Sequence, residues 1–586
     1  MNARSRRVLV VCMMGLSCMG LSCTGEPGAT PSISSDAPTA SHSNDRENDD
    51  SSSNVAPSDS QGTSPAKGIE AATADQSRQP RENSPPTPAD AGDVIATIGD
   101  VEIIARPRFS VSKETTYIEG PLTDEGYVDY LAAINALQSE GVTPENNAAV
   151  VLWQCIDPAT LTDIHRERFF AALGTAPPPA TNDYFITGAK FCRVEGTQEV
   201  DMARVNRLNT ELTKAISAPW NAKRLPLVAQ WIAANERPLE VAATASKRSR
   251  YYQPIVADEP YVLMCLQLPG ANEVGDLARL LVARAMLRIE QNDMDGAWQD
   301  IVTVYRLMRL LGQGHSATEG MLSAIFQRRA SEATIELLKQ FDPTLDQVRQ
   351  MEADLRALPQ QTTMAHKIDR GERFLYLDAT MALARYGPHR FEEMVNQSDW
   401  ESNSIRQFLG RLGALSLDWD QALVLGNGWY DRLANASRGS TYVERSRERS
   451  RMFDELEEVS RRANSRVTNI AIVTLTGRAK IEAASSQVSL MMVSMMLPPL
   501  IDAPGMEDRQ LATFDVARVA LALAACKSEQ GKFPRSLDEL VPNYISEVPP
   551  MHYTGKPLFY MRLFGGYSLA SSTPIDSITV NKLPIK

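Results

Sequence analysis

Histidine, aromatic residues and excess positive charge are all scarce in this sequence of 586 residues. Only six histidines occur, and none stands in a His-Glu-x-x-His pattern or another spacing typical of zinc ligands. Lysine and arginine number 60 against 72 aspartates and glutamates. The net charge of -12 disfavours nucleic acid as a partner, because nucleic-acid binding depends on basic side chains at phosphates. We therefore expect no metal, no cofactor and no nucleic-acid partner.

Motifs that would indicate catalysis are also missing. The mature chain has no Gly-x-Ser-x-Gly elbow, no phosphate-binding loop and no Cys-x-x-Cys. His315-Ser316, which follows Gly312-Gln313-Gly314, comes nearest to a nucleophile site. A glycine-rich turn in which Ser316 caps the next helix is the simpler interpretation. We expect His165 on the polar face of a helix, and we assign no catalytic residue.

The apolar run near the N-terminus is too short to cross a membrane. Val8–Leu21 has about 14 residues, whereas a spanning helix needs roughly 20. The run follows three positive residues, Arg4, Arg6 and Arg7, which is the order of a secretory signal peptide. Residues 1–22 are therefore predicted to be a signal, although the arginine pair also echoes a twin-arginine export signal.

The signal ends in Met-Gly-Leu-Ser-Cys written twice, which places cysteines at 18 and 23. Leu21-Ser22-Cys23 resembles the lipobox of bacterial lipoproteins, in which a peptidase cuts before a cysteine that carries a diacylglycerol. The family prefers leucine three residues before the cysteine, where both copies here have glycine. The resemblance implies lipid attachment at Cys23, because the whole apolar run then lies upstream. The alternative is that Cys18 and Cys23 are ordinary residues of a cleaved signal.

The segment after the signal lacks the residues that build a core. Thr24–Gly92 contains no aromatic residue, no leucine and no methionine. It cannot bury enough apolar surface to offset the entropy of ordering it. Residues 23–92 are therefore predicted to be a disordered tether rich in Ser, Pro and Asp, which suits a lipoprotein and equally a secreted protein.

Residues 93–505 are predicted to form a mainly α-helical domain, which begins with two short strands at 94–96 and 101–104. The clearest pattern is a helical hairpin over 276–311 with its turn at Gln291-Asn292-Asp293. It resembles one tetratricopeptide-type unit, but no 34-residue repeat follows. Further helices are expected at 320–340, 346–358 and 368–386, with breaks at Asp342-Pro343 and Gly387-Pro388. The predicted fold class is an irregular helical array or bundle.

Three further segments of this domain allow specific predictions. Thr143-Pro144-Glu145 is typical of a helix start, with Asn146 and Asn147 in its first turn as capping or surface amides or, alternatively, as ligand-binding groups. The helix should stop at Asp157-Pro158. Tyr442–Val467 interleaves Arg with Glu and predicts a solvated helix face, with a basic ligand face as the alternative. Val488–Leu497 is Met-rich and predicts a buried helix.

The mature body has four cysteines beyond Cys23. Export permits disulfides, and four cysteines allow three full pairings, which the sequence leaves open. Cys526 stands in an apolar helix and is predicted to be a buried thiol. The other three cysteines are Cys155, Cys192 and Cys265.

Residues 506–586 are predicted to form a small α+β unit. A helix apolar almost all round should end at a glycine, a capping box should start a short helical turn, and two strands should flank a glycine pair. These features fall in order at Leu511–Gln530, Gly531, Ser536 with Glu539, Leu558–Leu563, Gly565-Gly566 and Tyr567–Ala570.

This order resembles the globular part of type II secretion pseudopilins. The matching motifs are Gly531-Lys532-Phe533-Pro534, Ser536–Leu540, Val541-Pro542 and Gly555-Lys556-Pro557. The pseudopilin Asp-Pro is replaced by Pro550-Met551, and the acidic calcium loop has no match beyond Asp576. The resemblance thus implies a fold for about 65 residues, and neither calcium nor pilus assembly.

A second resemblance covers most of the chain after residue 93. Together with the C-terminal unit, Thr116-Tyr117, Gly120-Pro121-Leu122 and Thr143–Ala148 are similar to motifs of uncharacterised exported proteins of planctomycete-type bacteria. That resemblance implies export and no known activity.

We expect an exported, lipid-anchored protein of the cell envelope that acts as a non-enzymatic binding or scaffold module. Its expected partner is a protein of the envelope, with contact to the membrane through the lipid anchor only. The alternatives are an exported hydrolase with a motif-free active site and a component associated with a secretion system.

Overall fold

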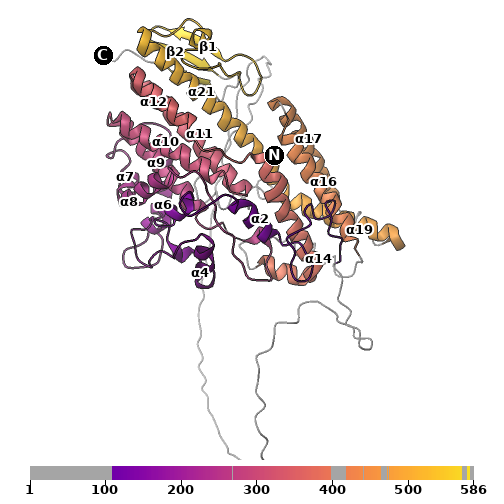
Figure 1. Ribbon diagram of the computed structural model, residues 1–586. Coiled ribbons are helices and arrows are strands. Elements are labelled where there is room, and N and C mark those ends of the chain that lie inside the picture. Colours follow the sequence, from indigo (N-terminus) through magenta and orange to yellow (C-terminus); the bar gives the residue numbers. More distant parts are fainter. Residues whose placement is uncertain are drawn as a thin grey trace, which may run out of the picture. The chain divides into compact units, whose positions relative to one another are not determined.

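The computed structural model describes residues 108–266, 268–396, 417–439, 441–463, 472, 474–570 and 577–580. The predicted signal, Cys23, the tether and the strands at 94–104 lie outside these residues. Within them the chain is mainly α-helical with one small sheet near the C-terminus, as predicted (Figure 1).

Short helices make up the first part. They are α2 (Tyr130–Ser139), α3 (Ala148–Leu152), η1 (Pro158–Thr160), α4 (Asp163–Ala172), α5 (Gly188–Phe191), α6 (Met202–Ala215), α7 (Pro226–Ala234), α8 (Glu236–Ala245) and η2 (Leu263–Cys265).

The predicted helix start at Thr143 is wrong by several residues. Thr143 and Asn146 form a turn, in which the Thr143 N–H donates to Asn146 Oδ1 at 2.8 Å. The helix α3 begins at Ala148, because the Asn147 side chain is its N-cap and accepts from the Ala149 N–H. The helix ends at Leu152, before the predicted stop at Asp157-Pro158.

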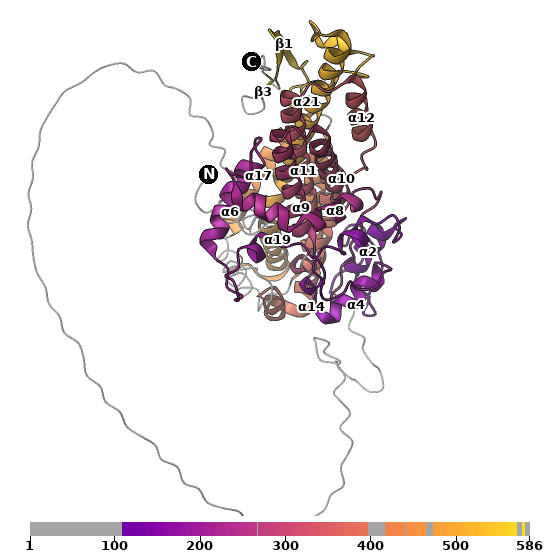
Figure 2. The ribbon, with the colours of Figure 1, turned by 90° about the vertical axis from the view of Figure 1, so that its left-hand side faces the viewer.

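Longer helices then pack in antiparallel pairs. They are α9 (Ala271–Glu290), α10 (Met294–Leu311), α11 (Ala317–Gln340) and α12 (Leu345–Arg356). The predicted hairpin and its turn at Gln291–Asp293 are confirmed, and Asp293 caps α10. Helix α10 packs between α9 and α11 (Figures 1 and 2).

The second half of the body is built from α13 (Met364–His366), η3 (Lys367–Glu372), α14 (Arg373–Asn396), α16 (Trp419–Ser437), α17 (Tyr442–Ala463), α19 (Gly477–Met496) and α20 (Pro498–Ile501). The segment η3 is a π-helix that joins α13 to α14 without a break. The predicted break at Gly387-Pro388 is a kink inside α14, where Gly387 has φ 75°.

The C-terminal unit follows its prediction closely. It consists of α21 (Ala503–Gln530), η4 (Leu537–Leu540), β1 (Phe559–Leu563), β2 (Gly566–Ala570) and β3 (Ser577–Val580). Gly531 ends α21 in the left-handed conformation, and Ser536 and Glu539 form the expected capping box. The hairpin turn is Phe564-Gly565 instead of the glycine pair, and the third strand was not predicted.

Two hydrophobic cores meet along α11. One core joins α3–α12 to α21 and the C-terminal unit, and includes Leu322 and Phe326 of α11. The other joins α2, α13, α14, α16, α17, α19 and α20, and includes Ala317 and Met321 at the start of α11. Helix α21 lies along α11 (Figure 2), so the C-terminal unit shares a core with the helical body.

Several side chains bear on the remaining predictions. The Met-rich helix is buried as expected, with Val488, Met492 and Val493 in the second core. The four cysteines of the body carry no disulfide, and Cys526 is a buried thiol as predicted. Among the described residues no single helix is long and apolar enough to cross a membrane. The helix α19 and the segment Pro498–Gln530, which are bent by 53° relative to each other, reach that length and apolar composition only as a pair.

The solvated face predicted for α17 is only partly correct. Most of its charged side chains are exposed, including Arg447 and Arg451. However, Arg445 and Arg449 point inward and pair with buried Asp508 of α21, at 2.6 and 3.3 Å. His552 also pairs with Asp508, at 3.0 Å. This cluster therefore ties α17 and the loop that carries His552 to α21.

Candidate functional site

The residues that the sequence singled out have structural roles in the described chain. The His165 imidazole lies 3.1 Å from the exposed Asp258 carboxylate, on a polar face of α4 as predicted. Asn147 is fully buried, and its amide exchanges hydrogen bonds with the backbone N–H and C=O of Tyr252. Both polar atoms of the Asn147 side chain are thus engaged within the protein, where they fix a loop to α3.

Ser316 is the N-cap of α11, as predicted. Its hydroxyl accepts from the Glu319 N–H at 3.1 Å and donates to Glu319 Oε2 at 3.0 Å. His315 Nδ1 lies 4.0 Å from the same oxygen. In serine hydrolases the imidazole stands between the hydroxyl and the acid. Here the carboxylate stands between them, so the imidazole cannot take the Ser316 proton directly.

A buried lysine lies beside this cap. Lys367, the first residue of the π-helix η3, is only 1% exposed, and its ammonium group donates to the Gly314 carbonyl. Three carboxylates act on its charge: Glu319 of α11, Glu372 of η3 and Glu507 of α21. These residues and His315 are called the inner cluster. No sequence pattern flagged Lys367.

The carboxylates of the inner cluster also accept hydrogen bonds at helix starts. Glu372 accepts from the Ala317 N–H in the first turn of α11 at 2.7 Å, and Glu507 accepts from the Met364 N–H at the start of α13. The first N–H groups of a helix have no partner within it and carry partial positive charge. These carboxylates therefore satisfy backbone donors that burial would otherwise leave unpaired.

Burial dominates the proton affinities in the inner cluster. It lowers the pKa of Lys367 to about 8 and lowers the pKa of His315. Burial also raises the pKa of Glu372 and of Glu507. Each shift disfavours the charged form of its group. Burying these charged groups therefore costs free energy, which the hydrogen bonds and packing around the inner cluster must offset.

Glycines make room for the inner cluster. A Cβ on Gly320 would lie 2.8 Å from Lys367 Cδ, and one on Gly314 would lie 2.2 Å from the Glu319 carboxylate. A Cβ on Gly371, inside the π-helix, would lie 2.1 Å from the His315 carbonyl oxygen. Glycine in a helix interior is unfavourable unless a close approach requires it. A glycine at position 371, inside a predicted helix, was therefore the signal in the sequence that another part of the backbone approaches here.

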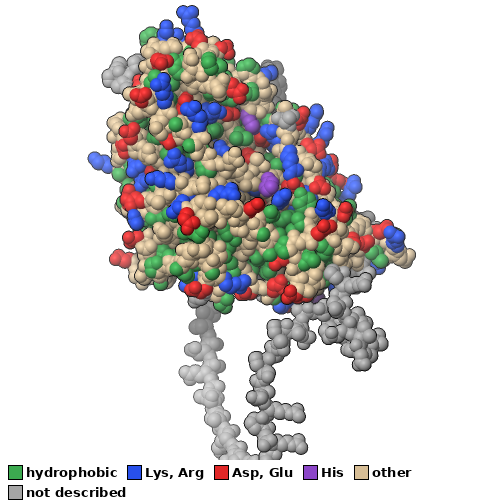
Figure 3. All heavy atoms as spheres, in the orientation of Figure 1, with side chains coloured by type: hydrophobic (Ala, Val, Ile, Leu, Met, Phe, Trp, Pro, Cys, Tyr) green, Lys and Arg blue, Asp and Glu red, His purple; other side chains and the backbone are tan. Residues whose placement is uncertain are grey.

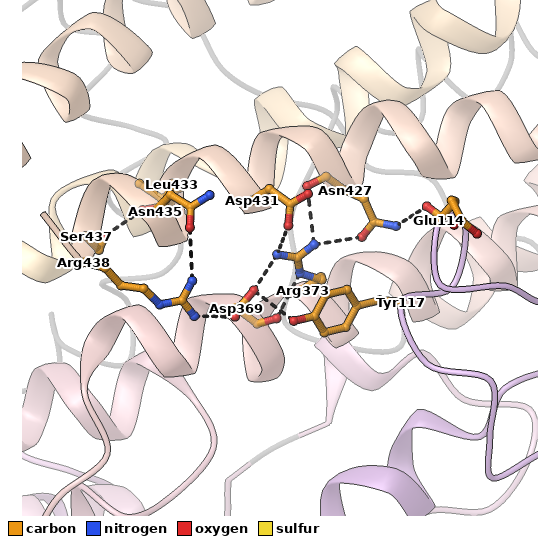
Figure 4. A network of polar contacts seen from close by, with 10 residues as sticks. All are labelled: Glu114, Tyr117, Asp369, Arg373, Asn427, Asp431, Leu433, Asn435, Ser437 and Arg438. Carbon is orange, nitrogen blue, oxygen red and sulfur yellow. Dashed lines mark hydrogen bonds and ion pairs between the residues drawn. The ribbon is translucent and has the colours of Figure 1, made fainter.

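The other side of the π-helix carries a second network, the outer cluster (Figure 4). Its centre is Arg373, whose guanidinium is fully buried. Arg373 Nη2 donates to Asp369 Oδ1 at 2.6 Å and to Asp431 Oδ1 at 2.7 Å. Arg438 also pairs with Asp369. Burial alone would raise the pKa of Asp369, but the hydrogen bond from Arg438 and the charge of Arg373 outweigh it and hold this pKa below its usual value.

The outer cluster fastens the first described segment to the helices. The Tyr117 ring lies under the Arg373 guanidinium at 4.1 Å, and its hydroxyl donates to Asp369 Oδ1 at 3.3 Å. Asn427 of α16 accepts from Arg373 and donates to the carbonyl of Glu114 at 2.9 Å (Figure 4). It also donates to the carbonyl of Thr115 at 2.9 Å. Tyr117 has φ 63°, a region that an aromatic residue rarely occupies and that costs about 1–3 kcal/mol.

Both clusters have a structural role, because their charged groups hold helices to one another. The Arg373 guanidinium, the Lys367 ammonium and the Asp369 carboxylate are all bonded within the protein. A cavity of about 20 Å³ borders His315 and Glu319, which is room for about one water. In the described part of the chain, no group of three or more His, Cys, Asp or Glu side chains is placed to hold a metal ion.

The C-terminal unit carries a different candidate, an uncovered sheet face. Phe559 and Met561 of β1 are 55% and 48% exposed, and Phe564 at the hairpin turn is completely exposed. On the opposite face Tyr567 and Leu569 of β2 are buried, and the Tyr567 ring packs against Phe533 with ring centroids 5.0 Å apart. We call Phe559, Met561, Leu563 and Phe564 the outer sheet face.

The surface has two further features, a pocket and an apolar patch. A pocket of about 230 Å³ lies where α21 ends, lined by Lys527, Asp342, Phe533 and Tyr567 among others, and the 2.7 Å Lys527–Asp342 ion pair stands at it. On the face in Figure 3 basic and acidic side chains are interspersed, and hydrophobic side chains gather between the positions of α2 and α16.

No protein-family model, no curated protein and no solved structure matches this chain.

Proposed function

We propose that this chain is an exported, lipid-anchored protein of a bacterial cell envelope that acts as a non-enzymatic binding or scaffold module. The proposal that the chain binds a partner is based on the outer sheet face. A completely exposed Phe564 beside the half-exposed Phe559 and Met561 puts apolar side chains of one hairpin into water. Contiguous apolar surface of this kind typically marks a contact with another macromolecule.

The N-terminal residues support the proposed location. A positive segment, a short apolar run and Cys23, followed by a long polar segment, are the order expected of an anchored protein whose body is displaced from the membrane. The inner and outer clusters support a scaffold, because their charged groups hold helices to one another. The alternatives are an exported hydrolase and a component associated with a secretion system, and no arrangement of the described residues specifically favours either of them.

Binding is tested by photocrosslinking in the intact envelope. A benzophenone amino acid at Met561 should give a discrete adduct with a different protein, at a mass distinct from that of a dimer of this chain. The same probe at Met202, which is 62% exposed on α6, is the matched control. Equal labelling from both positions, or no adduct at Met561, would overturn the binding proposal.

The anchor is tested by Cys23→Ala, with Cys18→Ala as its control, and by globomycin, which blocks lipoprotein signal cleavage. Cys23→Ala should alter processing and release the protein from the membrane fraction, whereas Cys18→Ala should change neither. If Cys18→Ala has the larger effect, the assignment of Cys23 is wrong.

A further inference from the structure

The strand β1 stands at an edge of the described sheet, whose order is β1-β2-β3. Leu563 and Gly566 close a two-residue turn, so they exchange backbone hydrogen bonds, and every second pair along an antiparallel ladder does the same. Met561 and Phe559 therefore bond to β2. The N–H and C=O groups of Tyr560 and Arg562 point away from β2, and within the described residues no other backbone group bonds to them.

An unpaired edge of this kind is a template for another strand. Proteins usually protect such edges with a charge that points inward, a proline or a bulge. Apart from Arg562 near the turn, β1 has none of these between its first and last residues, and its apolar side chains are exposed.

We propose that β1 pairs antiparallel with β1 of a second copy of this chain, about a two-fold axis at Met561. The inference goes beyond the proposed function, since self-association requires no partner protein. The outward backbone groups at 560 and 562 restrict the register, because they must face each other. Three registers satisfy this condition: 560 opposite 560, 560 opposite 562, and 562 opposite 562.

The side chains select the second of these registers. It alone aligns all five residues of β1: Phe559 faces the other copy's Leu563, Tyr560 faces Arg562, and Met561 faces Met561. Aromatic and aliphatic cross-strand pairs are favourable, and an arginine over a tyrosine ring gains a cation–π contact. The register with 562 opposite 562 would set two positive charges against each other.

Charge also favours a second copy at this location. The whole chain has a net charge of -12, which keeps copies apart over most of the surface. Residues 527–570, however, contain five Lys and Arg against four Asp and Glu. This part of the C-terminal unit therefore adds no net negative charge that would oppose a second copy, and pairing there joins the two outer sheet faces into one.

The proposal is tested on the purified full chain carrying Cys23→Ser, by light scattering and by oxidative crosslinking. We expect a mass that rises with concentration to twice that of the monomer. Met561→Asp, which puts two negative charges on the axis, should return the protein to the monomer mass. Met202→Asp, the matched control on another exposed methionine, should leave the dimer unchanged.

Crosslinking reports the register. In the added Met561→Cys variant the facing Cα atoms of a non-hydrogen-bonded pair stand about 4.5 Å apart, within disulfide range. This variant should form covalent dimers well above the background of the chain's own cysteines. Arg562→Cys should not, because its diagonal neighbour is about 7–8 Å away. A wild-type chain that stays monomeric, or a Met561→Cys yield at background, would overturn the proposal; efficient crosslinking of Arg562→Cys would overturn the register.

Discussion

Removing the buried ammonium of Lys367 gives a quantitative test of the inner cluster. Burial lowers the pKa of this lysine to about 8 from its ordinary 10.5. The folded state therefore holds the proton less tightly than the unfolded state does. Stability must rise as the pH increases from about 8 to 10.5, and the penalty is fully present below 8. A shift of this size corresponds to about 3 kcal/mol, of which roughly 2.5 kcal/mol falls between pH 7 and pH 10.

Lys367→Met lacks this titration but keeps the neighbouring carboxylates Glu319, Glu372 and Glu507. The difference in free energy of unfolding between the parent chain and the variant should therefore change by about 2.5 kcal/mol in favour of the parent between pH 7 and pH 10. Urea unfolding at a series of pH values measures this difference, and the titration of buried tyrosines cancels because both chains share it.

Lys339→Met is the control, because Lys339 is a half-buried lysine paired with Glu336 on the surface of α11. Loss of this surface ion pair should cost no more than about 1 kcal/mol at any pH of the series. If the difference in free energy of unfolding between the parent and Lys367→Met does not change between pH 7 and pH 10, the Lys367 ammonium is not buried at a cost in the inner cluster.

Three further predictions concern the same region and its neighbour α14. Arg373→Ala should cost about 2–5 kcal/mol in urea unfolding, because it empties a fully buried site and leaves Arg438 as the remaining cation at Asp369, and a cost under 1 kcal/mol would contradict the network. Gly371→Ala should cost about 1–3 kcal/mol by overpacking, whereas Gly428→Ala, whose Cβ meets nothing within 4 Å, should stabilise α16 by up to about 1 kcal/mol. Burial raises the pKa of Asp378 to about 7, so the stability that this group contributes should be lost as the pH rises from about 4 to 7, by about 4 kcal/mol at most. The difference in free energy of unfolding between the parent and Asp378→Asn should change by that amount over the same range.

The helices were predictable because their signals are local. The turn at Gln291–Asp293, the cap at Ser316 and the end of α21 at Gly531 each depend on residues within a few positions of one another. The misplaced start of α3 shows the limit of such signals. Thr143 and Pro144 match a helix start, but the buried contacts of Asn147 with Tyr252 fix the cap four residues later.

The inner and outer clusters were not predictable, because they depend on contacts between residues far apart in the sequence. Arg373 and Lys367 stand among residues that resemble an ordinary polar helix face. What makes them buried is the arrival of Tyr117, Glu507 and Asn427 from distant parts of the sequence. The inward turn of Arg445 and Arg449 toward Asp508 has the same origin, since nothing within α17 separates them from their exposed neighbours.

The glycines around Lys367 have a consequence for finding relatives of this chain. Gly314 and Gly320 admit the Glu319 carboxylate and the lysine stem, and Gly371 admits the His315 backbone. A chain that keeps the lysine must keep Gly320, and one that keeps Glu319 and the approach of the His315 backbone must keep Gly314 and Gly371. The two short stretches Gly314–Gly320 and Lys367–Arg373 should therefore be inherited as a unit, and together they form a search pattern that needs no overall similarity.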